Sequence, residues 1–207
     1  MNARLALAAL TALTLTCSSS WAYVVVDQES PTYSSFFDWV SSNVGQSFQQ
    51  TGTNVAGAGV KIGSDPYAGP GTSVSVTISL WSAQPYSGNS PLTAGSVSLI
   101  TEIEPIWADV FWNPVDVQPN TTYFLTVSGP PSTVPVLIDF AGPYSLGMAF
   151  GPNGSPAYRY YDMAFRTFAA SVPEPSSLAL VLSGFLSIAS LSSLKLRRGG
   201  KTRKRLI

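Results

Sequence analysis

The sequence contains no histidine and a single cysteine, Cys17, in 207 residues. Histidine is the usual general base and the commonest transition-metal ligand, so its absence excludes Ser-His-Asp catalysis, Cys-His catalysis and histidine-based zinc sites. A lone cysteine cannot form an intramolecular disulfide bond. Because most catalytic equipment is missing, we expect a protein that is not an enzyme.

Charge is also scarce. Charged residues make up 11% of the chain, against about 25% in a typical soluble domain. Lysine and arginine total 11, but eight of these lie near the two ends of the chain. Between Tyr23 and Ser171, three basic residues stand against ten acidic ones, a net charge of −7. This charge argues against a nucleic-acid partner, because phosphate groups must be neutralised by lysine and arginine.

Residues 1–22 have the features of a secretory signal peptide. Arg4 supplies the positive start, Leu5–Thr16 forms a short apolar run, and small residues precede a cleavage site between Ala22 and Tyr23. We therefore expect the Sec translocon and signal peptidase as partners.

Two alternatives for this leader are weaker. A retained anchor needs a longer apolar run. A lipidated Cys17 needs a small residue directly before the cysteine and usually a leucine three residues before it, where Thr16 and Thr14 stand.

A second apolar run, Ser176–Leu194, contains 19 residues without a charge, although serines dilute it. About 20 mostly apolar residues span a bilayer, so we expect a transmembrane helix here. The tail that follows, 195–207, should remain in the cytoplasm and residues 23–175 should lie outside, because basic flanks stay inside. The basic residues of this tail are Lys195, Arg197, Arg198, Lys201, Arg203, Lys204 and Arg205.

A short proline-rich motif precedes the predicted helix: Val172, Pro173, Glu174 and Pro175. Two prolines fix φ and remove amide donors, so the segment stays extended. An extended peptide just outside a membrane is a form that a protease can bind.

The order of this motif, a short apolar helix and a basic C-terminus resembles the PEP-CTERM sorting signal, from Val172 to about Arg205. The resemblance implies a Gram-negative bacterium that exports exopolysaccharide, and an exosortase that reads and processes the signal. The chain would be the substrate of that enzyme, passing through the inner membrane before it reaches the cell surface or the extracellular matrix.

Residues 23–170 have the pattern of an all-β domain. In Ser73–Trp81, apolar and small polar residues alternate strictly, as in a half-buried antiparallel strand. The spacing of strands and turns predicts a jelly-roll-like antiparallel β-sandwich between the signal peptide and the sorting segment 171–207. One short helix is expected at Tyr33–Ser42. The other predicted strands are Tyr23–Asp27, Gln46–Gln50, Val55–Ile62, Gly95–Thr101, Ala108–Trp112, Thr122–Ser128, Val134–Phe140, Tyr144–Phe150 and Tyr161–Phe168.

This region also resembles the choice-of-anchor class of extracellular β-sandwich domains. The resemblance implies a fold and a location but no activity. The segments that carry it are Gln46–Phe48, Ser79–Ser82, Thr121–Leu125 and Tyr161–Thr167.

Three sets of side chains are candidates for a site. Glu102 and Glu104 could pair as in a glycosidase, but Pro105 follows directly and favours a solvated turn. Calcium takes carboxylate oxygens, and we consider Asp27, Asp139 and Asp162 as its ligands, since they lie near predicted strand ends. Aromatic faces bind sugar rings, and the candidates for a sugar platform are Trp107, Trp112, Tyr158 and Tyr160; the alternative is that these rings fill the core.

The sequence thus predicts an exported, surface- or matrix-associated protein without enzymatic activity. The alternative is a carbohydrate-binding module of the extracellular matrix, with calcium as an optional stabilising ion.

Overall fold

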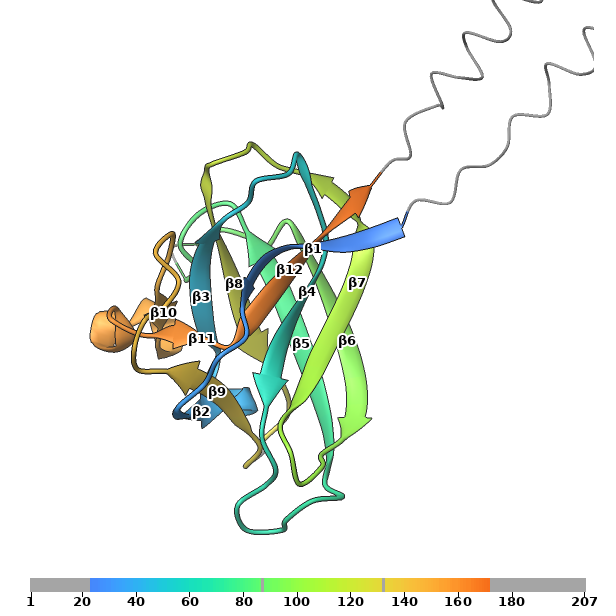
Figure 1. Ribbon diagram of the computed structural model, residues 1–207, viewed down its shortest axis with the longest axis vertical. Helices are drawn as coiled ribbons and strands as arrows, with labels where there is room; N and C mark the ends of the chain where they lie inside the picture. Colours follow the sequence, from blue (N-terminus) through green and yellow to red (C-terminus); the bar gives the residue numbers. More distant parts are fainter. Residues whose placement is uncertain (1–22, 87, 132, 172–207) are drawn as a thin grey trace, which may run out of the picture. The chain divides into compact units, whose positions relative to one another are not determined.

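The computed structural model describes residues 23–86, 88–131 and 133–171, which form two antiparallel β-sheets packed face to face (Figure 1). The predicted signal peptide, sorting motif and transmembrane helix, together with the basic tail, lie outside the described residues. The strands are β1 (Tyr23–Ser30), β2 (Ser35–Trp39), β3 (Val44–Gln49), β4 (Asn54–Ile62), β5 (Ser73–Trp81), β6 (Thr93–Ile100), β7 (Ile106–Asp116), β8 (Thr122–Ser128), β9 (Pro135–Asp139), β10 (Ala149–Phe150), β11 (Asp162–Met163) and β12 (Phe165–Ser171). Three short 3-10 helices accompany them, η1 (Val40–Ser42), η2 (Pro152–Gly154) and η3 (Pro156–Tyr158).

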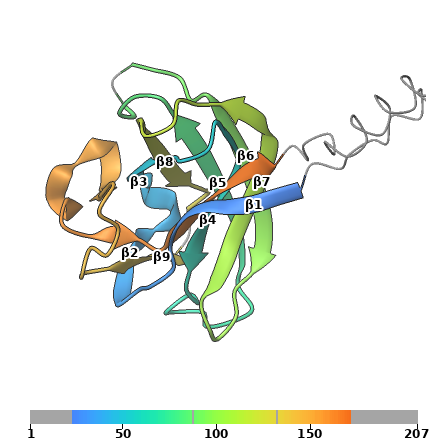
Figure 2. The same cartoon turned by 45° about the horizontal axis from the view of Figure 1, so that its top comes forward.

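The larger sheet follows the order β1-β12-β4-β9-β11, with β7 paired to β4 and β2 paired to β9. The smaller sheet follows the order β10-β3-β8-β5-β6. Figure 2 shows the two layers and the first and last strands side by side at one corner of the body. The prediction of an all-β sandwich is confirmed.

The core between the sheets is apolar. On β5, Val74, Val76, Ile78 and Leu80 are buried, so the alternation seen in the sequence marks the inner face. Phe48 and Phe165 meet across the sandwich with ring centroids 6.3 Å apart. Burial of each such side chain stabilises the fold by about 1.5–3 kcal/mol.

A buried glutamine connects the two sheets by hydrogen bonds. Gln46 on β3 has no exposed surface. Its Nε2 donates to Oδ1 of Asp162 over 2.8 Å, and its Oε1 accepts from the backbone N–H of Met163 over 2.8 Å. Two of the segments on which the choice-of-anchor resemblance rests are therefore bonded to each other, which gives them a structural role.

A second group of buried hydrogen bonds joins β12 to β1 and to the residue that follows β3. Thr167 Oγ1 donates to Oε1 of Gln50 over 2.9 Å and accepts from the backbone N–H of Gln28 over 3.2 Å. Gln50 Nε2 donates to the carbonyl of Asn54 over 3.1 Å. These bonds satisfy polar groups that would otherwise cost free energy in the core.

The helix predicted at Tyr33–Ser42 is wrong. The segment forms β2, paired with β9, followed by the 3-10 turn η1. Phe37 is buried at 6% exposure while its neighbour Phe36 is 59% exposed, an alternation that a strand provides and a helix does not. Aromatic side chains also favour strands.

Two predicted strands are shorter or interrupted. Of Tyr144–Phe150 only Ala149–Phe150 is a strand, because the N–H of Tyr144 donates to the Asp162 side chain rather than to a neighbouring strand. The segment Tyr161–Phe168 is divided at Ala164, whose N–H donates to Leu137 on β9 while its carbonyl accepts from Lys61 on β4. The chain changes its strand partner at that residue.

The outer face of the larger sheet depends on two glycines of β4. Gly57 lies between Phe111 on β7 and Phe168 on β12, whose ring centroids are 4.9 Å apart. Gly59 occupies the same place between Asp109 and Arg166, which form an ion pair. The missing side chains allow partners on strands either side of β4 to meet above it.

We expect Gly57→Ala to lower the free energy of unfolding by about 1–3 kcal/mol, because overpacking forces backbone shifts. A Cβ there would lie 2.5 Å from the carbonyl oxygen of Val110 and 2.8 Å from Cδ1 of Phe111. Urea unfolding followed by tryptophan fluorescence measures the loss. Gly52→Ala is the matched control, since the nearest atom would be 3.5 Å from its Cβ. Equal stability of the two variants would contradict the expectation.

Candidate functional site

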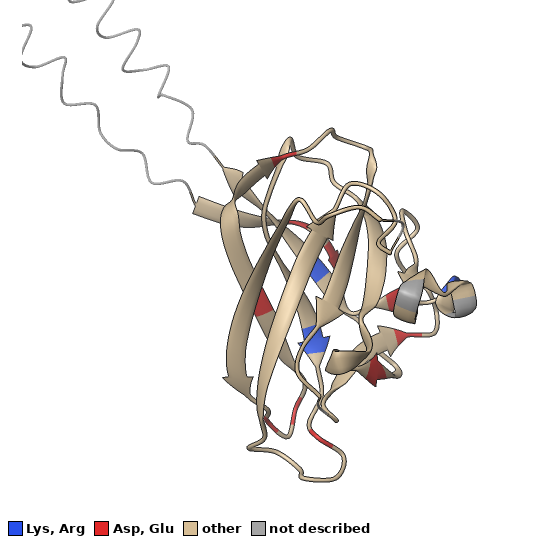
Figure 3. Cartoon of the chain, turned by 180° about the vertical axis from the view of Figure 1, so that it is seen from behind, with Lys and Arg blue, Asp and Glu red and all other residues tan. Residues whose placement is uncertain are grey.

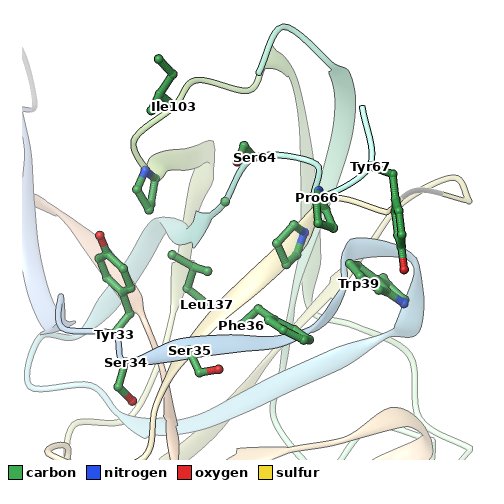
Figure 4. Close-up of a pocket in the computed structure, with 13 residues that line it drawn as sticks. Tyr33, Ser34, Ser35, Phe36, Trp39, Ser64, Pro66, Tyr67, Ile103 and Leu137 are labelled. Atoms are coloured by element: carbon green, nitrogen blue, oxygen red, sulfur yellow. The ribbon is translucent and has the colours of Figure 1, made fainter. Parts of the chain in front are cut away.

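A groove of about 600 Å³ lies beside β2 (Figure 4). Four aromatic residues define it, and we call it the aromatic groove: Tyr33, Phe36, Trp39 and Tyr67. Its remaining lining is apolar or carries hydroxyl groups, with no charged side chain: Ser34, Ser35, Gly63, Ser64, Pro66, Ile103, Pro105, Pro135 and Leu137. The volume falls within the range of small-molecule sites.

The rings of the aromatic groove form a strip. Phe36 and Trp39 are nearly parallel, with an interplanar angle of 11° and centroids 5.9 Å apart. Tyr67 continues the strip 6.5 Å from Trp39, and Figure 4 shows Tyr33 at the opposite end. Phe36 is 59% exposed and Tyr67 is 82% exposed. Large apolar rings gathered in a solvent-facing hollow are typical of an interaction site.

A β-bulge in β2 creates this strip. In a regular strand, residues three apart point to opposite faces. The pairing with β9 shifts between Phe36 and Asp38, so Phe36 lies opposite Leu137 and Trp39 lies opposite Pro135. Because residues 135 and 137 share a face, the two rings share it as well. Bulges commonly redirect side chains in this way beside functional sites.

Tyr67 is positioned by the turn that starts at Asp65. Asp65 Oδ1 accepts from the backbone N–H groups of Tyr67 and Ala68 over 2.8 and 2.9 Å, and Oδ2 accepts from the Thr133 hydroxyl. The Thr133 hydroxyl and these two N–H groups hold the pKa of Asp65 below its ordinary value of 3.8. Asp65 is therefore a positioning residue for one wall of the aromatic groove.

The predicted sugar platform is not assembled as one surface. Trp107 lies on the outer face of β7, where its ring centroid is 4.2 Å from the guanidinium carbon of Arg166. Trp112 points to the inner face, where its Nε1 donates to the carbonyl of Val55 over 3.0 Å and its ring packs against the core.

The two tyrosines of that prediction lie elsewhere. Tyr158 packs edge-on against buried Phe37, with ring centroids 4.4 Å apart. Tyr160 is 69% exposed and stacks under Arg159 at 4.7 Å. Ring contacts between members of the predicted set are absent from the described residues.

The three candidate calcium ligands are held by different partners. Asp139 and Asp162 are opposite each other on β9 and β11. Asp27, however, accepts from the hydroxyl and N–H of Thr51 and from the N–H of Gly52. Across residues 23–171 as described, no group of three or more carboxylate, thiol or imidazole side chains could hold a metal ion.

The Asp139–Asp162 pair has opposite pKa shifts. The backbone N–H of Ala141, with the Thr32 hydroxyl, holds the pKa of Asp139 below its ordinary value, whereas burial raises the pKa of Asp162. Such pairs occur in acid–base sites. Here Asp162 is 1% exposed, and its two oxygens accept from Gln46 and Tyr144. A substrate has no route to this carboxyl group, so the pair is structural.

Glu102 and Glu104 are exposed and lie in the bend before β7, in agreement with the solvated turn expected from the sequence. Between them, Ile103 is 79% exposed and lines the aromatic groove. The two acids are therefore the chain neighbours of a groove residue, although neither lines the groove itself.

Comparison with protein-family models finds none that matches the chain, and comparison with curated proteins finds no match. Among the residues that the structure describes, no helix has the length and apolar character needed to cross a membrane. The function must therefore be inferred from the chain's own motifs and geometry.

We expect the stabilising contribution of Asp65 to be present above pH 3.8 and to disappear as the pH falls further through its lowered pKa. Wild type should melt at a higher temperature than Asp65→Asn at pH 6, and the difference should shrink below pH 3.8. Thermal unfolding at pH 6 and below pH 3.8, followed by circular dichroism, measures the difference in melting temperature. A difference in melting temperature that does not change with pH would show that ionisation of Asp65 does not stabilise the fold.

Proposed function

We propose that the chain is an exported, non-enzymatic protein that an exosortase sorts and cleaves, and that its folded body binds polysaccharide of the extracellular matrix. The Sec translocon, signal peptidase and inner membrane would be its partners in transit, and exopolysaccharide its final partner. The jelly-roll-like arrangement predicted for the sandwich suits this role, because lectin domains use the same architecture. Calcium is not part of the proposal.

The positions of the two ends of the body support the sorting part of the proposal. Strands β1 and β12 are neighbours in the sheet, and the start of β1 lies beside the end of β12 (Figure 1). The predicted signal-peptide cleavage site precedes Tyr23 and the sorting motif follows Ser171. A body whose two ends leave from one corner can stand on one side of a membrane while either end is processed.

The fold remains tightly held up to the sorting motif. The side chain of Asn54 makes two hydrogen bonds to Ala170: Nδ2 donates to its carbonyl over 3.1 Å, and Oδ1 accepts from its N–H over 2.8 Å. Ala170 stands two residues before Val172. Cleavage near the motif would therefore leave the body intact, which fits a signal that is removed after use.

The aromatic groove carries the binding part of the proposal. The C–H-rich face of a sugar ring is attracted to the negative face of an aromatic ring. Phe36, Trp39 and Tyr67 present three rings in succession, and the Tyr33, Tyr67 and Ser64 hydroxyls lie within the same lining for hydrogen bonds. An extended row of rings favours a chain of sugars over a single sugar, since each added contact forms within an already bound molecule.

Processing can be measured directly. We expect the mature protein from producing cells to lack the tail 195–207, and the intact C-terminus to persist when the exosortase gene is deleted. Mass spectrometry of the C-terminal peptide distinguishes the two forms. The double substitution Pro173→Ala/Glu174→Ala should also retain the tail. A mature surface protein with its tail intact would refute the sorting proposal.

Binding can be tested with groove variants. We expect Phe36→Ala and Trp39→Ala to weaken binding by about ten-fold each, since loss of a stacked ring costs roughly 1–3 kcal/mol by analogy with base stacking. Affinity electrophoresis through gels containing hydroxyethylcellulose, galactomannan or the producing cell's own exopolysaccharide gives the dissociation constants.

Tyr160→Ala is the matched control, because this ring, like that of Phe36, is mainly exposed but does not line the groove. It should bind like wild type. Phe36→Ala guards against misfolding, since that side chain is mainly exposed and its loss leaves the core intact. Retained binding in both groove variants, or an equal loss in the control, would refute the role of the groove.

A further inference from the structure

We infer that the aromatic groove selects uncharged polysaccharide chains and discriminates against acidic ones. This inference rests on the proposed function, because it specifies the ligand of the same groove. It follows from the distribution of charge in and around the groove.

The lining of the groove offers an acidic sugar no partner. None of its residues is charged. A carboxylate that entered would lose hydration without gaining an ion pair, which is unfavourable. A neutral sugar pays a smaller free-energy cost for losing its hydration, because its hydroxyl groups can form hydrogen bonds with hydroxyls such as those of Tyr33, Ser64 and Tyr67.

Two acidic residues are the chain neighbours of a residue that lines the groove. Glu102 and Glu104 flank the lining residue Ile103 and are both exposed. Among the described residues neither is in an ion pair, since the ion pair found there joins Arg166 and Asp109. An acidic chain that contacts Ile103 would therefore approach a segment carrying two negative charges.

Lys61 is the basic residue that lies nearest to the groove among those the structure describes. Lys61 Nζ lies 4.8 Å from the ring centroid of Tyr33, but it also lies 5.3 Å from that of Trp107 and donates to the carbonyl of Pro31 over 3.0 Å. It thus belongs to the outer face of the larger sheet and is absent from the groove lining. Its one positive charge stands against the two negative charges of Glu102 and Glu104.

The body as a whole adds to the discrimination. Residues 23–171 carry a net charge of −7, and Figure 3 shows acidic residues on several elements and few basic ones. Repulsion between this surface and a polyanion acts over about 10 Å at 0.1 M salt and further at lower salt. The discrimination should therefore be strongest at low ionic strength.

The test uses the protein purified from cells that make it and two matched pairs of polymers. One pair is hydroxyethylcellulose and carboxymethylcellulose; the other is polygalacturonate and its carboxyl-reduced form. We expect the neutral member of a pair to bind about ten-fold more tightly near 10 mM NaCl, and the difference to narrow as salt is raised to about 300 mM.

A charge variant tests the cause. Glu104→Gln should improve binding of the acidic polymer about two-fold at low salt, as expected for removal of one nearby charge, and leave neutral binding unchanged. Asp116→Asn is the matched control: Asp116 ends the 11-residue strand β7 and Glu104 precedes its start. The two are separated by roughly 33 Å, beyond the screening length.

The outcomes separate the two proposals. If the acidic polymer binds as tightly as the neutral one and Trp39→Ala still abolishes binding, the groove is a polysaccharide site and the inference about charge is wrong. If Glu104→Gln and Asp116→Asn act equally, the charge of Glu104 is not the cause and the inference is also wrong. If no polymer binds, or Trp39→Ala binds like wild type, the proposed function fails and the inference fails with it.

Discussion

The hydrogen bonds of Gln46 hold the two sheets in register. An unpaired amide at this depth would cost about 1–3 kcal/mol, yet Gln46 bonds both to the side chain of Asp162 and to the backbone of Met163. Apolar contacts such as Phe48 against Phe165 favour burial but tolerate sliding, whereas these bonds fit one alignment only. Directly after Met163, the sheet pairing is interrupted at Ala164, where the chain passes from β9 to β4 and continues as β12.

Basic and acidic residues are concentrated in different parts of the chain. The basic residues are concentrated in the tail and the acidic ones in the body, so the uncleaved chain is formally neutral and the body alone is strongly acidic. In the proposed route, the tail would favour membrane retention with the C-terminus inside before cleavage. After cleavage, like charge on every copy of the body would oppose self-association. One cut would then change both the location of the protein and its tendency to self-associate.

Much of the sandwich could be predicted from the sequence, but the groove could not. Strict alternation identifies β5 at its observed bounds, Ser73–Trp81, because one face is buried along its whole length. The segment Tyr33–Ser42 has no such alternation, since the bulge in β2 and the exposed rings break the period. Four aromatic residues within Tyr33–Trp39 were the available signal, and their strand preference could have indicated it. Tyr67 comes beside Trp39 only when the chain folds, so the sequence gives no sign that the two rings belong to one groove. The separation of Trp107, Trp112, Tyr158 and Tyr160 likewise could not be seen in the sequence, because their positions depend on how the strands fold.

The high exposure of Phe36, Tyr67 and Ile103 has an evolutionary consequence. Because these side chains contribute little to the core, substitutions there change recognition at small cost in folding. The buried ties of Gln46 and Gln50 leave no such freedom, since each substitution there strands a polar partner. If the groove binds polysaccharide as proposed, selection could adapt it to new polymers while the scaffold stays fixed, and related bodies would diverge fastest along this strip of rings.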